Sequence, residues 1–296
     1  LTVIGNDIYV NGLYIGDGNG KFRREGWKNN SINSIDLIPG DNGKTIFIGC
    51  GNGVMTSNDF GKKWKILTDW DVTEVLSVKI HPLNHNIIFA GTAFGIWKST
   101  DNGKSWKSKN TGLKPVNQTF IQSIRISVSG AVYAGSADGI LVSYNEGESW
   151  AELGLKGKEI NVVELAPYND SVIVCGTEDH GVFVSTNAGQ TWKQINMGLK
   201  SMTFYAIAFD PVNVGVIYCG GYKTGVYKTI NMGEKWMQLQ NEITDKDVKT
   251  IAVDKKNSRV VYAGLINYGL FKSTDGGETF LIEAEPDGRI GALFIK

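Results

Sequence analysis

The sequence predicts an all-β fold, a single seven-bladed β-propeller. An eight-residue motif recurs along the 296-residue chain at nearly constant spacing, and a fixed period of this kind is typical of repeat architectures. Each repeat also contains short segments rich in β-branched and aromatic residues, separated by turn residues, which is the pattern of a four-stranded propeller blade. No segment shows the apolar periodicity of an amphipathic helix.

The repeated motif has six copies with three restricted positions. The third position is Asp or Asn, the fifth is Gly and the eighth is aromatic. The third positions are residues 59, 101, 145, 187, 231 and 275, at intervals of 42, 44, 42, 44 and 44. The copies read SNDFGKKW (57–64), STDNGKSW (99–106), SYNEGESW (143–150), STNAGQTW (185–192), TINMGEKW (229–236) and STDGGETF (273–280).

The residue types in this motif have a structural explanation. A short Asp or Asn side chain accepts hydrogen bonds from nearby backbone, and Gly adopts positive φ without steric cost, so the central residues can close a hairpin. The final aromatic ring buries apolar area and anchors that turn. We therefore expect the motif to hold hairpins, and its aspartates to be poor catalytic candidates.

The motif resembles the Asp-box, or BNR repeat, of sialidases, xyloglucan-cleaving glycosidases, sortilin-type receptors and photosystem II assembly and stability factors. The resemblance covers nearly the whole chain and implies a β-propeller, but these proteins share no single function. It also implies that the motifs lie on one face. Ligand sites would then lie on the opposite face, at the loops between second and third strands and at the starts of the innermost strands.

Three strands are expected before each motif aromatic and one after it. In one repeat they are an alternating segment at 74–80, the run IIFAG, the run GIWKS, and the residues that follow Trp106. The two chain ends are expected to share the first blade, built from 1–29 plus 288–296. In it Arg289–Lys296 would be the first strand, Ile8–Val10 the second and Gly12–Gly16 the third, with a widened motif at 17–27. The whole chain, 1–296, is then one closed domain without free sheet edges.

Composition excludes several classes of protein. The chain has 30 basic and 30 acidic residues, so it lacks the basic surface expected for nucleic acid or an anionic membrane. No apolar run is long enough to span a bilayer as a helix. No metal site or cofactor is predicted, because the three histidines are scattered and no Cys/His spacing is typical of a metal site. Cys175 and Cys219 are expected to be small buried residues, with a disulfide between them as the lesser alternative. A monomer is expected, and the resemblance together with an N-terminal Leu1 suggests an extracytoplasmic or secreted protein.

The loops between second and third strands give the first set of candidate binding residues. Three of these loops, in the last three repeats, are longer than the others and combine aromatic rings with charged groups, as sugar or peptide binding requires. The same rings could instead pack on neighbouring blades. The candidates are Phe94, Asp138, Glu178, Asp179, His180, Tyr222, Lys223, Asn267 and Tyr268.

The innermost strands give a second set. When they are aligned on the turn that follows them, four consecutive repeats place a charged residue two positions before that turn: Asp36, Lys79, Arg125 and Glu164. Charged groups are rarely buried unless they are paired. A mutually paired network in the central channel is expected, and a polar ligand site at that level is the alternative.

The leading functional hypothesis is a non-catalytic binding or assembly scaffold that recognises a protein partner or a glycan. The chain has five arginines, two of them adjacent, too few well-placed ones for the arginine triad that the resemblance to sialidases would require. The alternative is a glycoside hydrolase or carbohydrate-binding protein of the xyloglucanase type. Those enzymes use a cleft between two propellers and a pair of carboxyl groups, whereas this chain holds one propeller.

Overall fold

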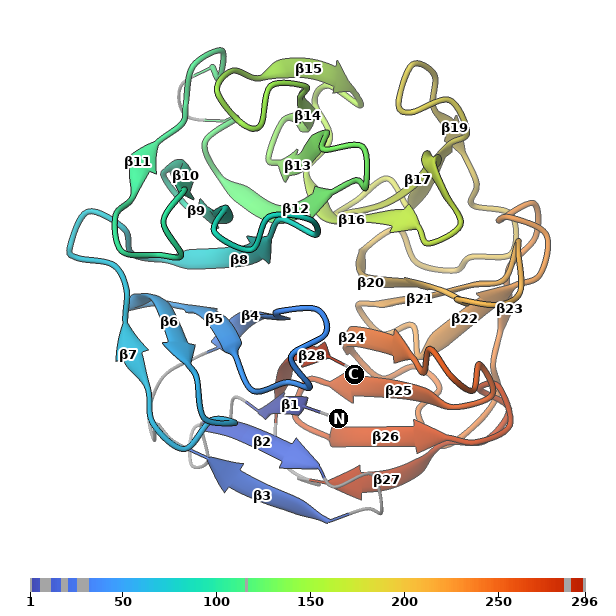
Figure 1. The fold of residues 1–296 in the computed structure, drawn as a ribbon. Coiled ribbons are helices and arrows are strands. Elements are labelled where there is room, and N and C mark those ends of the chain that lie inside the picture. Colours follow the sequence, from blue (N-terminus) through green and yellow to red (C-terminus); the bar gives the residue numbers. More distant parts are fainter. Residues whose placement is uncertain are drawn as a thin grey trace.

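The protein is an all-β ring of four-stranded antiparallel sheets around a central axis, as the computed structural model shows (Figure 1). The structure describes residues 2–5, 12–16, 21–25, 32–114, 117–284 and 289–294. No helix occurs in this described part, and hence none that could span a membrane. The predicted all-β propeller class is confirmed.

Six blades are each formed by four consecutive strands, with the first strand nearest the axis and the fourth at the rim. Three of them are β4 to β7 (Ile32–Leu37, Ile46–Cys50, Gly53–Ser57, Lys65–Ile66), β8 to β11 (Val75–Ile80, Ile88–Thr92, Gly95–Ser99, Lys107–Ser108) and β12 to β15 (Ile121–Ile126, Val132–Ser136, Gly139–Ser143, Ala151–Gly154). The others are β16 to β19 (Ile160–Ala166, Asn169–Thr177, Val182–Ser185, Lys193–Gln194), β20 to β23 (Phe204–Phe209, Ile217–Gly221, Val226–Thr229, Met237–Gln238) and β24 to β27 (Val248–Val253, Val261–Leu265, Gly269–Ser273, Leu281–Ala284).

The remaining sheet joins the two ends of the chain. The prediction of a seven-bladed propeller with the first blade closed by the C-terminal strand was wrong about how the ring closes, because the structure has six blades of four consecutive strands and a terminal sheet whose strand partners differ from those predicted. Its strand order is β28 (Ile290–Phe294), β1 (Thr2–Gly5), β2 (Gly12–Gly16), β3 (Phe22–Glu25). The predicted partner of the C-terminal strand, Ile8–Val10, lies outside the described residues, and β28 pairs instead with β1, Thr2 opposite Phe294. Six blades therefore follow the repeat, and this terminal sheet, which lacks a standard motif, is a separate arrangement.

Glycines explain how neighbouring sheets stack. Each second strand is buried along its apolar run, as in β9 and β13, and it ends in the Ala-Gly or similar pair seen in the sequence. A Cβ added at Gly91 would lie 2.6 Å from Ile121 of the next blade. A Cβ at Gly264 would lie 2.5 Å from Ile290, the first residue of β28. The missing side chain thus lets each blade approach the next, including the terminal sheet.

The repeated motif forms the turn between the third and fourth strands. In the second copy Ser99 Oγ donates to Asp101 Oδ1 at 2.8 Å and accepts the Gly103 N–H at 2.8 Å, and Asp101 Oδ1 accepts the Ser105 N–H at 2.9 Å. The other five copies repeat these three contacts, and their fifth-position glycines have positive φ. The motif carboxylates are therefore engaged in the turns.

Four motif tryptophans, Trp106, Trp150, Trp192 and Trp236, tie their blades to the preceding ones. The indole Nε1 of Trp150 donates to the Lys109 carbonyl at 2.8 Å, and that of Trp236 donates to the Ile195 carbonyl at 2.6 Å. Both acceptors belong to the previous blade, in its fourth strand or just after it. Trp106 makes the same type of bond to Leu67 at 3.2 Å while remaining partly exposed. These bonds add a directional contact to the apolar packing between sheets.

Candidate functional site at the open end of the channel

A bulge in every innermost strand determines which residues face the axis. The pairing register shifts after the first residue of the strand, between Val75 and Ser77 in β8 and at the equivalent place in the others. An extra residue at a bulge breaks the two-residue alternation of a strand. In β8 and β20 the second and fifth residues are accordingly the partly exposed ones, and the rest are buried. Axis-facing residues are therefore three apart.

These positions form two tiers of side chains along the channel. We call the second residues the mouth tier, because they lie near the strand starts, at the end of the ring that holds the loops between second and third strands. We call the fifth residues the inner tier. A cavity of about 540 Å³ is lined by residues of all seven innermost strands. The mouth tier is Asn33, Leu76, Gln122, Asn161, Tyr205, Lys249 and Gly291, and the inner tier is Asp36, Lys79, Arg125, Glu164, Ala208, Ala252 and Phe294.

The four predicted channel charges of the inner tier form two separate ion pairs. Lys79 Nζ lies 3.0 Å from Asp36 Oδ1, and Asp36 Oδ2 also accepts the Ile80 N–H at 2.8 Å. Arg125 Nε donates to Glu164 Oε2 at 2.9 Å, and a second guanidinium nitrogen contacts the other carboxylate oxygen. Burial alone would lower the pKa of Arg125, but the charge and hydrogen bonds of Glu164 raise it above its ordinary value. Each pair bridges two neighbouring blades, so the geometry fits the paired network.

Serine hydroxyls join the same blades between the two tiers. Ser34 Oγ accepts the Val78 N–H at 3.0 Å, Ser77 Oγ accepts that of Ile124 at 3.0 Å, and Ser123 Oγ accepts that of Val163 at 3.2 Å. The next strands carry Val162, Ala206, Thr250 and Ala292 at this position. One part of the channel is therefore tied together by polar contacts across the blade boundaries, while the part lined by β20 and β28 is apolar at this level.

Two carboxylates stand at the mouth on the β16 side. Gln122 Nε2 donates to Glu159 Oε1 at 2.7 Å, and Asn161 Nδ2 donates to Glu178 Oε2 at 2.8 Å. Burial and the nearby charge of Glu178 raise the pKa of Glu159. Burial and the same charge also raise the pKa of the Tyr205 hydroxyl. The amide side chains thus hold a pair of acidic groups beside the mouth tier.

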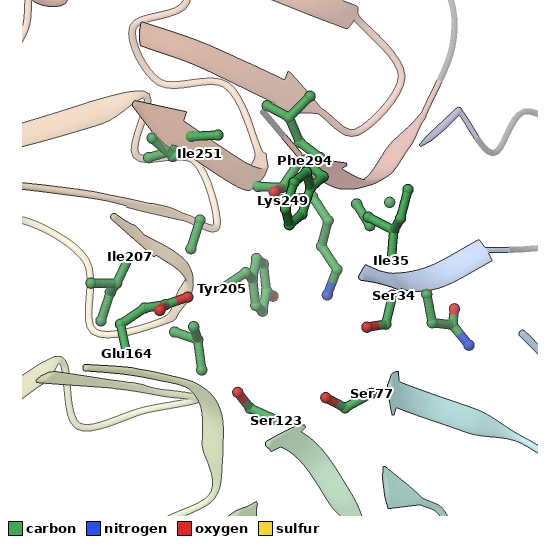
Figure 2. Close-up of a pocket in the computed structure, with 18 of the residues that line it drawn as sticks. Ser34, Ile35, Ser77, Ser123, Glu164, Tyr205, Ile207, Lys249, Ile251 and Phe294 are labelled. Carbon is green, nitrogen blue, oxygen red and sulfur yellow. The ribbon is translucent and has the colours of Figure 1, made fainter. Parts of the chain in front are cut away.

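A lysine lies across the cavity from the serines. Lys249 extends into the space that Ser34, Ser77 and Ser123 also border (Figure 2). Its Nζ lies 4.9 Å from the Tyr205 ring centroid, and no carboxylate of the described residues lies within 4.0 Å of it. Burial, and then the charge of Arg289, lower the pKa of Lys249. The ammonium group is therefore a partly desolvated cation without an ion pair among the residues that the structure describes.

Predicted loop residues lie around this open end in two groups. Glu178, Asp179 and His180 follow β17, and of these Glu178 reaches the mouth tier through Asn161. Asp179 is exposed and its carboxylate contacts His180 Nδ1. Asp138 belongs to an earlier blade, and its carboxylate accepts the Gly157 N–H at 2.7 Å, so it supports a neighbouring loop.

The aromatic loop residues are exposed. Phe94, Tyr222 and Tyr268 have 67%, 49% and 43% of their surface exposed. Lys223 Nζ lies 5.2 Å from the Tyr222 ring centroid, and Lys246 Nζ lies 4.3 Å from that of Tyr268. Asn267 has a positive φ of 66° and Lys223 one of 50°, a conformation that the tight loops impose. The rings are therefore available for contact, and two of them carry a cation on one side.

Sequence reasoning missed the mouth tier and its neighbours Glu159 and Arg289. The alignment that found Asp36 and Glu164 also contains Asn161, Tyr205 and Lys249 three residues earlier. A strict two-residue alternation from the inner tier points to the serine positions instead. The alternation fails because the bulge places the axis-facing residues three apart and not two apart.

Other candidate groups are buried or dispersed. Cys50, Cys175 and Cys219 are buried free thiols, so the lesser alternative of a disulfide between Cys175 and Cys219 was wrong. Burial raises the pKa of the Cys175 and Cys219 thiols. In the part of the chain that the structure describes, no group of three or more His, Cys, Asp or Glu side chains is arranged to hold a metal ion.

Comparison with known proteins bears on the fold. No family model matches the sequence, and no curated protein matches it. Among solved structures, the GH74 xyloglucanase from Xanthomonas campestris superposes with a TM-score of 0.76 and 15% identity over 95% of this chain and 52% of that one. The fold is a β-propeller.

Two further solved structures also superpose on this chain. YCF48 bound to D1 peptide superposes with a TM-score of 0.68 and 16% identity over 92% of this chain and 88% of that one. The extracellular domain of a B. thetaiotaomicron protein described as a one-component system superposes with a TM-score of 0.71 and 16% identity over 92% of this chain and 38% of that one. This chain spans about half the length of the GH74 structures. At these identities the comparisons support the fold alone, and function has to be argued from the site.

Proposed function

We propose that the protein is a non-catalytic binding or assembly scaffold of the Asp-box type, which recognises a protein partner or a glycan at the face opposite the motif turns. The observation that carries this proposal is the set of exposed rings and charged side chains at one end of the channel. The motif turns join third to fourth strands, whereas the loops of Tyr222 and Tyr268 join second to third strands. The two sets therefore lie at opposite ends of each third strand.

The chemistry of this face suits a large partner. Tyr222 and Tyr268 present stacking surfaces, and Glu178, Lys223 and Asn267 present charged and amide groups from the same three blades. Aromatic residues and their polar neighbours are typical of interface hot spots, where truncation costs roughly 2 kcal/mol or more. Support for a peptide comes from YCF48, whose structure was solved with a D1 peptide. Support for a glycan comes from the GH74 xyloglucanase.

A capture experiment on the loop face tests the proposal. Peptide and glycan arrays are first screened with the wild-type protein, and the strongest binder is then titrated against Tyr222→Ala, Tyr268→Ala and Glu178→Ala. Tyr144→Ala is the matched control, because Tyr144 is 70% exposed but belongs to a motif turn on the other face. The proposal requires at least one loop variant to weaken binding tenfold or more, which corresponds to roughly 1.4 kcal/mol, while Tyr144→Ala does not. Unchanged affinity in all three loop variants would contradict it.

A glycoside hydrolase is the second candidate, favoured by one observation. Glu159 and Glu178 lie on neighbouring segments, where the Glu178 N–H donates to the Glu159 carbonyl at 3.0 Å, and a pair of carboxyl groups is the arrangement that glycosidases use. The GH74 neighbours are about twice as long as this chain, so a second propeller would have to supply the other wall of a cleft. Release of reducing ends from xyloglucan, abolished in Glu159→Gln, would establish this alternative over the scaffold.

The remaining parts of the proposal concern setting. We propose an extracytoplasmic or secreted location, which agrees with the extracellular domain among the structural neighbours, and a monomer that works without a cofactor. Fractionation of the source cells with an antibody against the protein tests the location. Sedimentation of the purified chain tests the oligomeric state.

A further inference from the structure

The charge lining the channel differs from the charge of the whole protein. The chain has equal numbers of acidic and basic residues, yet five cationic side chains and one carboxylate line the cavity: Lys79, Arg125, Lys249, Lys255, Arg289 and Glu164. Lys79 and Arg125 are neutralised by Asp36 and Glu164. Among the described residues, the other three cations have no carboxylate within 4.0 Å. Lys255 and Arg289 are exposed, so Lys249 is the partly buried cation of the cavity without an ion pair among the described residues, and the charge of Glu178 at the mouth partly offsets it by raising its pKa.

Lys249 is the cation best placed to meet a ligand inside the channel. Its Nζ projects into the cavity, where Ser77 and Ser123 also face (Figure 2). These two hydroxyl oxygens accept backbone N–H groups, and among the described residues their own protons have no acceptor. A cation and two free O–H donors facing one space are groups that an anion can satisfy. An ammonium group that stays partly desolvated without an ion pair costs free energy that a bound anion would recover.

The wall that faces the serines, which also carries Lys249, includes a group of apolar side chains. Ala206 and Ile207 come from β20, Ala252 from β24, and Ala292 and Phe294 from β28. At the inner-tier position where four other blades carry charges, β24 carries Ala252 and β28 carries Phe294. A fully ionic or heavily hydroxylated ligand would leave these apolar side chains without favourable contacts. An apolar group packed there would gain roughly 25 cal/mol for each Å² of surface removed from water.

The size of the cavity limits the ligand. Pockets for small molecules usually enclose about 300–1,000 Å³, and this cavity of about 540 Å³ falls within that range. Tyr205, Asn161 and Gln122 of the mouth tier are among the residues that line it. A free small molecule therefore fits the space better than a folded partner, which would remain on the loops outside.

We propose that the channel binds a small amphipathic anion, a carboxylate or similar acid on an apolar body, with the acid group at Lys249 and the apolar body against Ala252, Ala292 and Phe294. This site is distinct from the loop face of the proposed scaffold. The acid receives the Lys249 ammonium group and the hydroxyls of Ser77 and Ser123. The apolar body displaces water from the β20, β24 and β28 wall.

Titration calorimetry with octanoate, octanol and inorganic phosphate separates the two halves of the proposal. Octanoate should bind, and octanol and phosphate should each bind at least tenfold more weakly, because each lacks one half of the ligand. Lys249→Met should weaken octanoate binding roughly ten- to hundredfold, the range for a hydrogen-bonded charge, and Lys249→Arg should retain most of it. Lys62→Met, on an exposed motif turn, should have no effect.

A second pair of variants tests the apolar wall by using the repeat itself. Ala252 occupies the inner tier, where other blades carry Asp36, Lys79, Arg125 and Glu164, so the fold accepts a charge at that position. Ala252→Glu should abolish octanoate binding, because it places a negative charge beside the bound anion. Ala252→Arg should lower the octanoate affinity less than Ala252→Glu does. Melting curves close to that of wild type are the condition for reading either variant.

Three results would overturn the inference: no binding of octanoate at millimolar concentration, equal affinity for octanol and octanoate, or unchanged octanoate binding in folded Lys249→Met. The scaffold proposal is judged separately by Tyr222→Ala and Tyr268→Ala. Octanoate binding that survives while no macromolecular partner is found would sustain the channel site and reject the scaffold.

Discussion

Replacement of Trp236 by alanine should strongly destabilise the ring. Trp236 is 2% exposed and packs in the cluster that contains Phe204 and Tyr227. Its Nε1 also donates to the Ile195 carbonyl of the preceding blade at 2.6 Å. Truncation of a buried Trp to Ala typically costs about 3–5 kcal/mol, because the transfer free energy is lost and a cavity remains.

A phenylalanine variant separates the ring from the hydrogen bond. Trp236→Phe keeps most of the apolar area but leaves the buried Ile195 carbonyl without its donor, which costs about 1–3 kcal/mol. The last motif copy shows that a benzyl ring can fill this position, because Phe280 is fully buried there. Trp106→Ala serves as the matched comparison: Trp106 is only partly buried, so its loss should cost less than that of Trp236.

Equilibrium unfolding in guanidinium chloride, followed by circular dichroism, measures these differences without relying on the fluorescence of the removed residue. Thermal melting should fall by roughly 6 °C or more in Trp236→Ala, taking about 2–4 °C for each kcal/mol in large domains. The expected order of stability is wild type, then Trp236→Phe, then Trp236→Ala. If Trp236→Ala melted with wild type, or if Trp106→Ala were the more damaging change, the motif tryptophan would not tie the blades as described.

Three further predictions concern pH and ring closure. Burial lowers the pKa of His81, whose Nδ1 accepts the Leu83 and Asn84 N–H groups at 3.2 Å. The contribution of His81 to stability is therefore complete above about pH 6.5 and is lost as pH falls through the lowered pKa. His81→Asp should remove this loss of melting temperature in acid. A variant whose melting temperature falls with pH as that of wild type does would contradict this prediction. Hydrogen bonds from the Ser105 side chain and backbone hold the pKa of Asp101 at about 2, below its ordinary 3.8, so its contribution is present above pH 3.8 and lost as pH falls toward 2. Asp101→Asn should change how the melting temperature depends on pH only below about pH 3.8. A change in that pH dependence near pH 7 would refute this assignment. Removal of residues 289–296 takes away β28 and leaves the β1 edge unpaired; the melting temperature should fall well below that of a chain shortened only by residues 295–296, and equal melting of the two would show that closure contributes little.

The motif made the fold class predictable because its residue types are dictated by local geometry. Ser99, Asp101 and Gly103 form their turn through contacts within five residues, so the sequence pattern is sufficient to recognise it. The Ala-Gly pair that ends each second strand was also visible in the sequence, although the sequence did not explain why a glycine is needed there. Only the structure shows that Gly91 lies against Ile121 of the next blade.

The terminal sheet and the mouth tier were not predictable for different physical reasons. Local pattern placed the second strand of the terminal sheet at Ile8–Val10, whereas hydrogen bonding places it at Thr2–Gly5. Pairing between distant strands is set by the whole ring, which a local pattern does not contain. Asn161 and Lys249 were missed because one bulge per strand changes the axis-facing spacing from two residues to three. The ion pair between Lys79 and Asp36 could be predicted, because the aligned repeats place both residues in one tier.

The pairing of β1 with β28 means that the ring cannot close until the C-terminal strand has been synthesised. On a ribosome that adds roughly 5–20 residues each second, the strand that covers β1 emerges about 15–60 s after β1 itself. During that interval blades can form in order from neighbouring segments, while the inner edge of β1 offers unpaired N–H and C=O groups to any other strand. Because loop closure grows costlier with chain length only slowly, the delay is a problem of exposure time more than of free energy. A nascent chain stalled before Ile290 should therefore associate with other chains more readily than the finished ring.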